Sequence, residues 1–540
     1  RSEITKEALF MLHDFLTARQ DLKTKQLSLF PFYNFNFIPI ELISNIYEIL
    51  LGKEKKDKDK AYYTPEYLAD YIVDRTVKEF LVNENECKIL DPSCGSGIFL
   101  IKSLQKNSEL NGFFQNKNKL NKLIENNIYG IDYNEEAIDV TIFSLYITLF
   151  DYQDPKKLEG FKLPLLKNNN IIFGDFFDEK KTKLIENIEF KFILGNPPWG
   201  QIKNQEKYKE YCKNRKFVIP NKEICTAFLL KVKDLGTVNT KCSLIIPSKI
   251  LYKIGDTSIN FRKELLTNIQ LEQVLEISSV RKQIFKEAIA PAAVFSFLCR
   301  QSSTDHKVEY ISLKPNKFLR LYNLIMVESN DIKYVKQKLF MENDYLWKIL
   351  VYGDFELLND MKINFDTIEN IILKKGLIMK KGLQDNDGKA DSSHLIGKKI
   401  LNSKSAVDHF YLDDKEYTIF NKKKINRPRS PEIYKAPYVL FKKGVDSKNY
   451  SIKAVYTEKD FLYRDTITCI KGSKEDENIL LNLCGLLNSS LFSYFNLMLG
   501  SSVGIEREQI FLEEIAKYPY RYSDKLVEIV KKIQQQIKND

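Results

Sequence analysis

The chain contains the segment Ile193-Leu194-Gly195-Asn196-Pro197-Pro198-Trp199-Gly200, which carries more chemical information than any other part of it. The hydrophobic run over residues 188–194 predicts a short buried strand, which the Gly-Asn-Pro-Pro sequence ends. The turn that follows is stiff, because each proline fixes its own φ and lacks an N–H. An amide, carbonyl groups and an indole therefore lie just beyond a strand's carboxyl end, where ligands bind in open α/β sheets. An amide oxygen and a carbonyl oxygen can both accept hydrogen bonds from one exocyclic amino group, while the indole stacks on the ring that carries it.

A glycine-rich turn follows an earlier strand, in the segment Lys88-Ile89-Leu90-Asp91-Pro92-Ser93-Cys94-Gly95-Ser96-Gly97-Ile98. Gly95 and Gly97 allow positive φ and let a ligand approach the backbone closely. The segment is neither a Walker P-loop nor a full dinucleotide fingerprint. The carboxylate of Asp91 at the strand end suits a ligand with an ammonium group better than a pyrophosphate, which favours S-adenosylmethionine over NAD.

Two further strand ends carry residues of a ligand-binding type. Residues 128–132 end in Asp132, and a carboxylate in that place is the usual partner of ribose hydroxyls in doubly wound sheets. The run over residues 170–173 is followed by Gly174-Asp175-Phe176, which adds a carboxylate and an aromatic ring. Because helical patterns separate these strands, the sequence predicts a parallel sheet with its site along one edge.

The segment before these strands predicts helices. Residues 38–51 have apolar side chains at helical spacing, and residues 53–60 are a run of charges typical of a solvated loop. Thr64 is expected to cap the next helix, with Pro65 at its first position.

The composition is that of an ordered protein, and its excess of basic residues suggests a polyanionic partner. The chain has 540 residues, enough for more than one domain, and is 44% hydrophobic and 12% aromatic. Its formal net charge is +11, from 83 basic and 72 acidic residues. Because the eight cysteines form no C-x-x-C pair and only four histidines are present, we expect reduced thiols, a cytoplasmic location and no metal. The sequence has no signal peptide or apolar run of membrane-spanning length, so no membrane partner is expected.

Taken in order, these motifs resemble those of the gamma class of N6-adenine DNA methyltransferases. That class belongs to restriction-modification systems of type II or type IIG and to related phage-defence systems. In it the cofactor-binding half precedes the catalytic motif, and a target-recognition domain follows both. The matching motifs are Tyr63-Thr64-Pro65, Asp91-Pro92-x-x-Gly95-x-Gly97, Gly130-x-Asp132, Gly174-Asp175-Phe176 and Asn196-Pro197-Pro198-Trp199.

The resemblance implies a fold and a division into domains. The expected fold is α/β, with a doubly wound, mostly parallel Rossmann-like methyltransferase domain and a C-terminal α+β target-recognition domain. Three segments are expected: an N-terminal helical segment at 1–60, a methyltransferase domain at 61–312 and a DNA target-recognition domain at 313–540. In the last of these, residues 438–444 and 466–470 indicate strands, and residues 479–498 and 523–537 indicate helices.

The resemblance also implies site residues. The catalytic residues would be Asn196, Pro197, Pro198 and Trp199. The residues that would bind S-adenosylmethionine are Tyr63, Thr64, Asp91, Pro92, Cys94, Gly95, Gly97, Asp132, Asp175, Phe176 and Asn196. Phe285 would stack on the flipped base, although a place in the hydrophobic core explains this residue equally well.

A basic, proline-broken segment at residues 421–431 is typical of a loop that follows a nucleic-acid backbone. An ordinary solvated run of charges explains it equally well. The segment supplies the candidate DNA contacts Lys422, Lys423, Lys424, Arg427 and Arg429.

The expected reaction is methyl transfer from S-adenosylmethionine to N6 of an adenine in double-stranded DNA. The amino nitrogen of adenine is a poor nucleophile, because its lone pair is delocalised into the ring. Acceptors at Asn196 and Pro197 would favour a pyramidal nitrogen, so catalysis would rest on positioning and electrostatics, without a general base or a metal. The base must leave the duplex to reach such a site.

Three other interpretations remain open. The chain could act on rRNA or on a protein amide, although such enzymes are usually shorter. It could be the methyltransferase part of a bifunctional restriction enzyme whose nuclease lies outside this chain, since the nuclease-like pattern Asp178…Glu189-Phe190-Lys191 belongs to the strand before Asn196. It could also be an inactive recognition subunit, against which the intact Asp91, Asn196 and Trp199 argue. Besides double-stranded DNA, other restriction or defence subunits are candidate partners.

Overall fold

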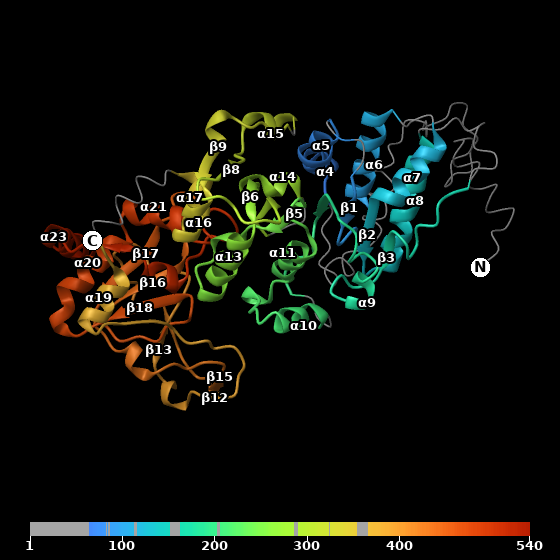
Figure 1. The fold of residues 1–540 in the computed structure, drawn as a ribbon. Helices are drawn as coiled ribbons and strands as arrows, with labels where there is room; N and C mark the ends of the chain where they lie inside the picture. Colours follow the sequence, from blue (N-terminus) through green and yellow to red (C-terminus); the bar gives the residue numbers. More distant parts are fainter. Residues whose placement is uncertain are drawn as a thin grey trace, which may run out of the picture. The chain divides into compact units, whose positions relative to one another are not determined.

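The computed structural model describes residues 64–82, 84, 87–112, 116–151, 162–201, 206–285, 290–322, 324–353 and 365–539 (Figure 1). The expected N-terminal helical segment at 1–60 and the candidate Tyr63 lie outside these residues. The chain forms two compact units, of which the first ends at Pro198 and the second begins at Trp199. The expected boundary between residues 312 and 313 stays a prediction.

The first unit alternates short strands with helices. Its described strands lie in the order β3-β2-β1-β4, and each described pair is parallel. Its elements are α4 (Glu66–Val73), η2 (Asp74–Lys78), α5 (Glu79–Leu81), β1 (Ile89–Asp91), α6 (Ile98–Asn111), α7 (Lys117–Asn127), β2 (Ile128–Asp132), α8 (Glu135–Asp151), β3 (Ile171–Phe173), α9 (Glu179–Thr182) and β4 (Phe192–Gly195).

The register of these strands brings their carboxyl ends to one edge of the sheet. Ile89 of β1 pairs with Ile128 of β2 and with Phe192 of β4, and Gly130 of β2 pairs with Ile171 of β3. The strands therefore end together, and the turns that follow Asp91, Asp132 and Gly195 meet at the same edge. This arrangement confirms the predicted parallel layout.

Strand β4 is shorter than the hydrophobic run predicts. It begins at Phe192, whereas the run predicts a strand from residue 188. The N–H groups of Lys191 and Phe192 both donate to the Lys88 carbonyl oxygen, at 2.9 and 3.2 Å, so pairing with the β1 side starts only at this point. The hydrophobic run extends beyond the strand because Phe190, which precedes β4, is apolar and buried without being part of the strand.

The second unit begins with a mixed sheet in residues 199–353. Its strands are β5 (Lys241–Pro247), β6 (Gln270–Glu276), β7 (Ala292–Leu298), β8 (Lys307–Ser312) and β9 (Ile332–Lys336), in the order β5-β7-β6-β8-β9. The pair β6–β8 is parallel, and β5–β7, β6–β7 and β8–β9 are antiparallel. The helices here are α10 (Lys207–Asn214), η5 (Pro220–Lys222), α11 (Ile224–Leu235), α12 (Lys249–Tyr252), α13 (Asp256–Asn268), η6 (Ser278–Val280), α14 (Arg281–Ile284), α15 (Lys317–Tyr322), η7 (Ser329–Asp331), α16 (Gln337–Glu342) and α17 (Leu346–Tyr352).

The C-terminal part of the second unit has the predicted α+β architecture. An antiparallel sheet in the order β11-β18-β16-β17 is formed by β11 (Ile378–Lys381), β16 (Tyr438–Val445), β17 (Ile452–Thr457) and β18 (Ile467–Lys471). Short strand pairs flank it: β10 (Asp366–Thr367) with β19 (Pro519–Tyr520), β12 (Ala390–Asp391) with β15 (Lys424–Ile425), and β13 (Lys399–Leu401) with β14 (Tyr417–Ile419). The helices are α19 (Ile368–Lys375), η8 (Ser393–Leu395), η9 (Pro431–Tyr434), η10 (Lys474–Asp476), α20 (Glu477–Leu487), α21 (Ser490–Leu499), α22 (Leu512–Ala516) and α23 (Asp524–Asn539).

The prediction of one helix over residues 479–498 is wrong, because the chain breaks there into α20 and α21. Ser489 caps α21, with its Oγ accepting a hydrogen bond from the Phe492 N–H at 3.2 Å. The Asn488 side chain bonds to both backbone groups of Ala454 in β17, donating to the carbonyl oxygen at 2.8 Å and accepting from the N–H at 3.2 Å. Asn and Ser favour such local bonds over the helix interior, which explains the break.

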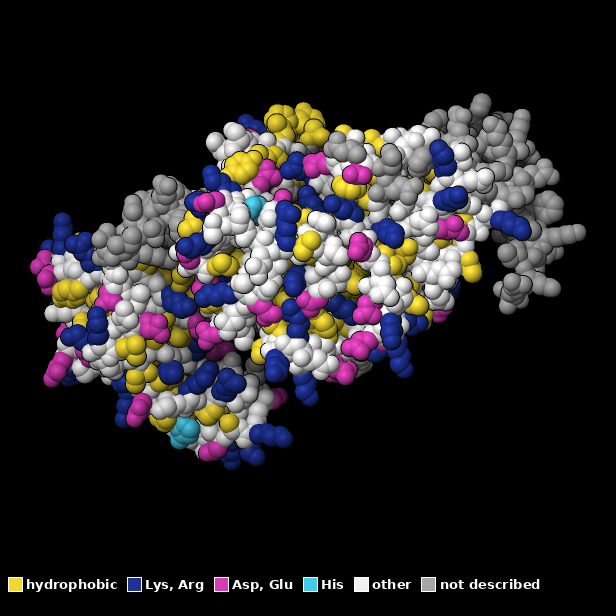
Figure 2. Space-filling model, in the orientation of Figure 1, with side chains coloured by type: hydrophobic (Ala, Val, Ile, Leu, Met, Phe, Trp, Pro, Cys, Tyr) yellow, Lys and Arg dark blue, Asp and Glu magenta, His cyan; other side chains and the backbone are white. Residues whose placement is uncertain are grey.

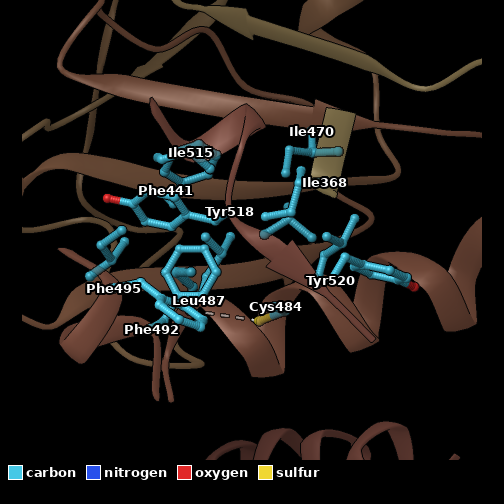
Figure 3. Close-up of a cluster of buried hydrophobic side chains, with 14 of the residues drawn as sticks. Ile368, Phe441, Ile470, Cys484, Leu487, Phe492, Phe495, Ile515, Tyr518 and Tyr520 are labelled. Atoms are coloured by element: carbon cyan, nitrogen blue, oxygen red, sulfur yellow. Dashed lines mark hydrogen bonds between the residues drawn. The ribbon is translucent and has the colours of Figure 1, made fainter. Parts of the chain in front are cut away.

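Helices α20 and α21 enclose a hydrophobic core with the strands beside them. Figure 3 shows Phe441 of β16, Leu487 of α20 and the rings of Phe492 and Phe495 of α21 among its members. Phe492 and Tyr518 lie 5.1 Å apart between ring centroids. This core holds the C-terminal part together, since each of these side chains is almost fully buried.

All eight cysteines lie in the part of the chain that the structure describes, and all are free and buried. Among the described residues no group of three or more His, Cys, Asp or Glu side chains is placed to hold a metal ion. No helix in the described ranges is long and apolar enough to cross a membrane.

Leu487→Ala should destabilise the C-terminal part by about 2–5 kcal/mol, because it removes a fully buried side chain and leaves a cavity. Hydrogen exchange in α20, followed by mass spectrometry, measures the effect. Leu373→Ala is the matched control, because Leu373 of α19 is 73% exposed and its loss should change little. Equal protection of α20 in both variants would contradict the assignment of this core.

Candidate active site

The glycine-rich turn after β1 is held by helix α8. Gly95 and Gly97 have φ of 51° and 90°, the left-handed region that favours glycine. Thr141 of α8 donates its hydroxyl to the Gly95 carbonyl oxygen at 2.7 Å. A Cβ at Gly97 would lie 2.9 Å from Thr141 Cγ2, so the turn needs glycine there for space as well as for conformation. Thr141 was not identified from the sequence, because nothing local marks it.

Asp132 connects the end of β2 to the same turn. Its Oδ2 accepts a hydrogen bond from the Gly95 N–H at 2.9 Å, and its Oδ1 accepts one from the Asn134 N–H at 2.8 Å. The carboxylate therefore positions the backbone of the glycine-rich turn. Each carboxylate oxygen has a second lone pair, so binding of ribose hydroxyls stays a compatible prediction.

Asp91 is a buried carboxyl at the centre of this edge. It is 1% exposed, and its Oδ1 accepts a hydrogen bond from the Ser93 N–H at 3.0 Å. Burial, and to a smaller extent the nearby Asp132, raise the pKa of Asp91 to about 8, although the hydrogen bond from Ser93 acts in the opposite direction. No cationic side chain of the described residues is among the groups that shift this pKa. Such a carboxyl is suited to a cationic ligand.

The motif after β4 packs directly on Asp91. A Cβ at Gly195 would lie 2.7 Å from Asp91 Oδ1 and 3.3 Å from Pro92 Cδ, so only glycine fits at the residue before Asn196. The Asn196 Nδ2 donates to Thr64 Oγ1 at 3.1 Å. The structure therefore brings Thr64, Asp91 and Asn196 to one place, although they are far apart in the sequence.

The predicted capping role of Thr64 is wrong. Helix α4 begins at Glu66, its N-cap position is occupied by Pro65, and no side chain of the described residues makes a capping bond. Thr64 is buried and bonds to Asn196 instead. Pro65 has φ of −60° and ψ of 139°, so the chain enters the helix from an extended conformation.

The remaining candidates of the first unit lie in turns or in the core. Asp175 Oδ1 accepts a hydrogen bond from the Phe177 N–H at 2.8 Å, which forms a turn after β3. Phe176 is buried, with its ring centroid 5.7 Å from that of Phe177. Burial raises the pKa of the Cys94 thiol well above its ordinary value, as expected of a packing residue. Adenine binding by Asp175 and Phe176 stays a prediction.

In the second unit, Phe285 lies beside Trp199. Their ring centroids are 6.1 Å apart with an interplanar angle of 71°, an edge-to-face pair. Trp199 is 2% exposed and Phe285 is 5% exposed. Phe285 follows α14, and its N–H donates to the Arg281 carbonyl oxygen at 2.6 Å. The two aromatic candidates are therefore neighbours, and their contact with a target base stays a prediction.

The candidate DNA-binding loop lies on the surface. Lys423, Lys424 and Arg427 are exposed. The exposed Lys422 donates to the Asp385 carbonyl oxygen at 2.6 Å, and the half-buried Arg429 donates through Nε to the Gly382 carbonyl oxygen at 3.3 Å. On the face shown in Figure 2, Lys and Arg side chains are interspersed with Asp and Glu rather than gathered into one patch.

A parallel sheet with a glycine-rich turn and Asn-Pro-Pro-Trp after neighbouring strands defines the class of α/β methyltransferases. A family model described as N-6 DNA Methylase matches residues 39–344, more than half of the 540 residues. The chain belongs to the N-6 DNA methylase family, in agreement with the predicted enzyme class, adenine-specific DNA methyltransferase.

Two similar proteins are named as type II methyltransferases, one of them also as a restriction enzyme. The chain is 21% identical over 592 residues to the type II methyltransferase M.BanIII of Aneurinibacillus aneurinilyticus, covering 90% of this chain and 94% of that protein. It is 26% identical over 312 residues to the type II restriction enzyme and methyltransferase RM.Eco57I of Escherichia coli, covering 47% of this chain. The chain spans only 31% of RM.Eco57I.

Solved structures show the same fold. The type IIL restriction-modification enzyme MmeI, determined in complex with DNA, matches with a TM-score of 0.61 and 13% identity, over 93% of this chain and 74% of that chain. A DrdV–DNA complex matches with a TM-score of 0.56 and 12% identity, over 92% of this chain and 59% of that chain. The predicted fold class is therefore confirmed.

The ligand-free chain should lose stability as the pH rises from about 4 to about 8. Asp91 has a pKa of about 8 when folded, against about 3.9 for an unfolded aspartate, so unfolding releases a proton throughout this window. Asp91→Asn removes this titration and should raise the melting temperature more at pH 8 than at pH 5. Asp387→Asn, at an exposed site, is the control for the same change of charge. If the melting temperatures of the wild type and Asp91→Asn changed equally with pH across this range, the burial of an uncompensated carboxyl would be contradicted.

Proposed function

We propose that the chain transfers a methyl group from S-adenosylmethionine to N6 of an adenine that is flipped out of double-stranded DNA. The observation that carries this proposal is the placement of the Asn196 amide, bonded to Thr64 and next to the buried Asp91, at the edge where the parallel strands end. The family match to N-6 DNA methylases supports the chemistry of the target atom.

The residues of the first unit fit the proposed cofactor. Asp91 would bind the cationic amino-acid end, because its carboxyl is buried and none of the described cationic side chains shifts its pKa. The backbone of the turn around Gly95 and Gly97 would hold the methionine portion, and Asp132 the ribose. When bound, S-adenosylmethionine supplies a methyl group on an electrophilic sulfonium.

The Asn-Pro-Pro-Trp motif would hold the target. The Nδ2 of Asn196 already donates to Thr64, which distinguishes the two ends of the amide and leaves Oδ1 as the end with acceptor chemistry. Together with the Pro197 carbonyl oxygen it would accept both hydrogens of the adenine amino group. This positions the nitrogen lone pair without a general base. Trp199 and Phe285 would supply aromatic surface for the base.

Binding to DNA would rest on charge and on the C-terminal part. The net charge of +11 and the exposed Lys423 and Lys424 suit a phosphate backbone. The solved relatives MmeI and DrdV are described in complexes with DNA. We assign sequence recognition to residues 313–540, and a cytoplasmic role in restriction-modification or phage defence, alone or with other subunits of such a system.

A second function is favoured by one comparison. RM.Eco57I is named as both a restriction enzyme and a methyltransferase, and this chain matches less than half of it. The chain would then be the methyltransferase part of a bifunctional enzyme. M.BanIII, named only as a methyltransferase, is covered over 94% of its length, which favours the simpler function. An assay for cleavage of unmethylated DNA by the native protein that contains this chain, and not by the chain alone, separates the two functions.

Asn196→Ala should reduce methyl transfer to DNA by at least about 100-fold, because misplacing the reacting amino group has effects of that size. The assay uses isotope-labelled S-adenosylmethionine and plasmid DNA, with N6-methyladenine identified by mass spectrometry of the digested nucleosides. Asn214→Ala, at an exposed site in α10, is the matched control. Label in another base or in protein, or full activity of Asn196→Ala, would refute the proposal.

Replacing Lys422, Lys423 and Lys424 together with Ala should weaken binding to all duplexes alike and flatten its salt dependence. Each lost phosphate contact lowers the slope of log K against log salt by about 0.9. Fluorescence anisotropy at several salt concentrations measures the slope. The control replaces the exposed Lys525, Lys531 and Lys532 of α23. An unchanged slope with an altered preferred site would make the first three lysines base readers.

A further inference from the structure

Glu223 is a buried carboxylate that contacts the turn just after the Asn-Pro-Pro-Trp motif. It is 4% exposed and directly precedes helix α11. Its Oε1 accepts a hydrogen bond from the Gly200 N–H. The next residue, Ile224, donates its N–H to the Gly200 carbonyl oxygen at 3.0 Å. Both backbone polar groups of Gly200 are thus held by consecutive residues of another segment.

Gly200 adopts a conformation that needs such support. Its φ is 86°, in the left-handed region, whereas a Cβ at this position would meet no atom of the described residues within 4 Å. Glycine is therefore required by the backbone and not by lack of space. Glycine adopts positive φ without strain but populates negative φ about as readily, so surrounding bonds are needed to hold one of the two conformations. Since Trp199 precedes Gly200, these bonds also fix the direction in which the chain leaves Trp199.

The Glu223 side chain does not serve its own helix. Glu223 occupies the N-cap position of α11, but its carboxylate makes no capping bond there. Its backbone carbonyl oxygen instead accepts hydrogen bonds from the Thr226 N–H at 3.1 Å and from the Thr226 hydroxyl at 2.7 Å. The carboxylate is therefore available to Gly200, where a plain helix cap would have used it.

A buried carboxylate also needs compensation for its lost hydration. Lys249 of α12 supplies it, with its Nζ 3.6 Å from Glu223 Oε2 and a side chain that is one quarter exposed. One oxygen of Glu223 thus faces the ammonium, and the other accepts from Gly200. This division means that the acceptor role and the charge can be separated by mutation.

We propose that Glu223 is a positioning residue for methyl transfer, which fixes the Gly200 turn and thereby the indole of Trp199 that receives the target base. It acts through the backbone and not as a base. The inference rests on the proposed function for its catalytic consequence, but the placement of Trp199 is testable by itself.

The first experiment observes Trp199 directly. The chain has two tryptophans, Trp199 and the fully buried Trp347. Incorporation of 5-fluorotryptophan gives two fluorine resonances, which Trp199→Phe assigns. Two double variants are informative: Glu223→Gln/Lys249→Met and Glu223→Met/Lys249→Met. They are called the Gln-containing and the Met-containing variant after the residue at position 223. Both lack the two charges, and they differ in whether position 223 offers Gly200 an acceptor.

We expect the Gln-containing variant to keep the Trp199 resonance near its wild-type position and the Met-containing variant to shift or broaden it. The Trp347 resonance should stay in place in both, which shows that the fold is intact. Glu206→Ala, at an exposed residue before α10, is the control and should change neither resonance. An unchanged Trp199 resonance in the Met-containing variant overturns the inference.

The second experiment measures methyl transfer under saturating cofactor. The Met-containing variant should lower kcat on the order of 10- to 100-fold, as expected for a misplaced contact, with the KM for S-adenosylmethionine within about 2-fold of wild type. The Gln-containing variant should retain most of the wild-type kcat. Equal loss in both variants would show that charge rather than acceptance matters, and would overturn the inference. If the wild type methylates no DNA, the proposed function fails, while the fluorine spectra still decide the role of Glu223.

Discussion

The close packing of the Asp91 carboxyl against the backbone of Gly195 is the constraint on which the first unit depends. A Cβ at Gly195 would lie 2.7 Å from the carboxyl oxygen, so only glycine allows the end of β4 to pack against Asp91. The approach buries Asp91 and raises its pKa to about 8. A carboxyl held in this way is costly to ionise without a cation beside it.

The other contacts of the edge follow from this approach. With β4 on one side of β1, the Asn196 amide reaches Thr64, just before α4, and with β2 on the other side, the Asp132 carboxylate reaches the Gly95 N–H. The Asn196 amide and the Asp132 carboxylate are thus each bonded to a residue of another segment. Because the partners are far apart in the sequence, the site exists only in the folded unit. This is the arrangement expected of a site whose chemistry depends on positioning.

In the second unit, aromatic candidate residues are likewise held by contacts with segments that are distant in the sequence. Trp199 lies edge to face with Phe285, and the turn after it is held by Glu223 and Ile224. The flexible Gly200, at positive φ, directly follows Trp199, whose ring position it could otherwise leave undetermined. Hydrogen bonds from a segment more than twenty residues later in the chain hold Gly200 in place.

Local sequence is sufficient to predict a candidate site residue where that residue ends or directly follows the strand that positions it. Asp91, Gly97 and Asp132 were identified because a carboxylate or a glycine follows an apolar run, and the structure places them together. Thr141 and Glu223 could not be identified in this way, since a Thr inside a helix and a Glu before one are common. For Thr64, the Thr-Pro pair predicts a helix cap, whereas the side chain bonds to Asn196. Only the fold shows that Asn196 lies nearby. The break at Asn488 was missed because apolar periodicity continues across it, while the asparagine bonds to a strand that the pattern does not reveal.

Proton release on binding S-adenosylmethionine tests the central role of Asp91 most directly. Calorimetric titrations at pH 7 in buffers of different ionisation enthalpy give the number of protons exchanged. If the buried carboxyl is protonated when free and ionises against the bound cation, the wild type releases about one proton more than Asp91→Asn, given its pKa of about 8. Equal proton exchange by the two proteins, with both saturated, would contradict the account.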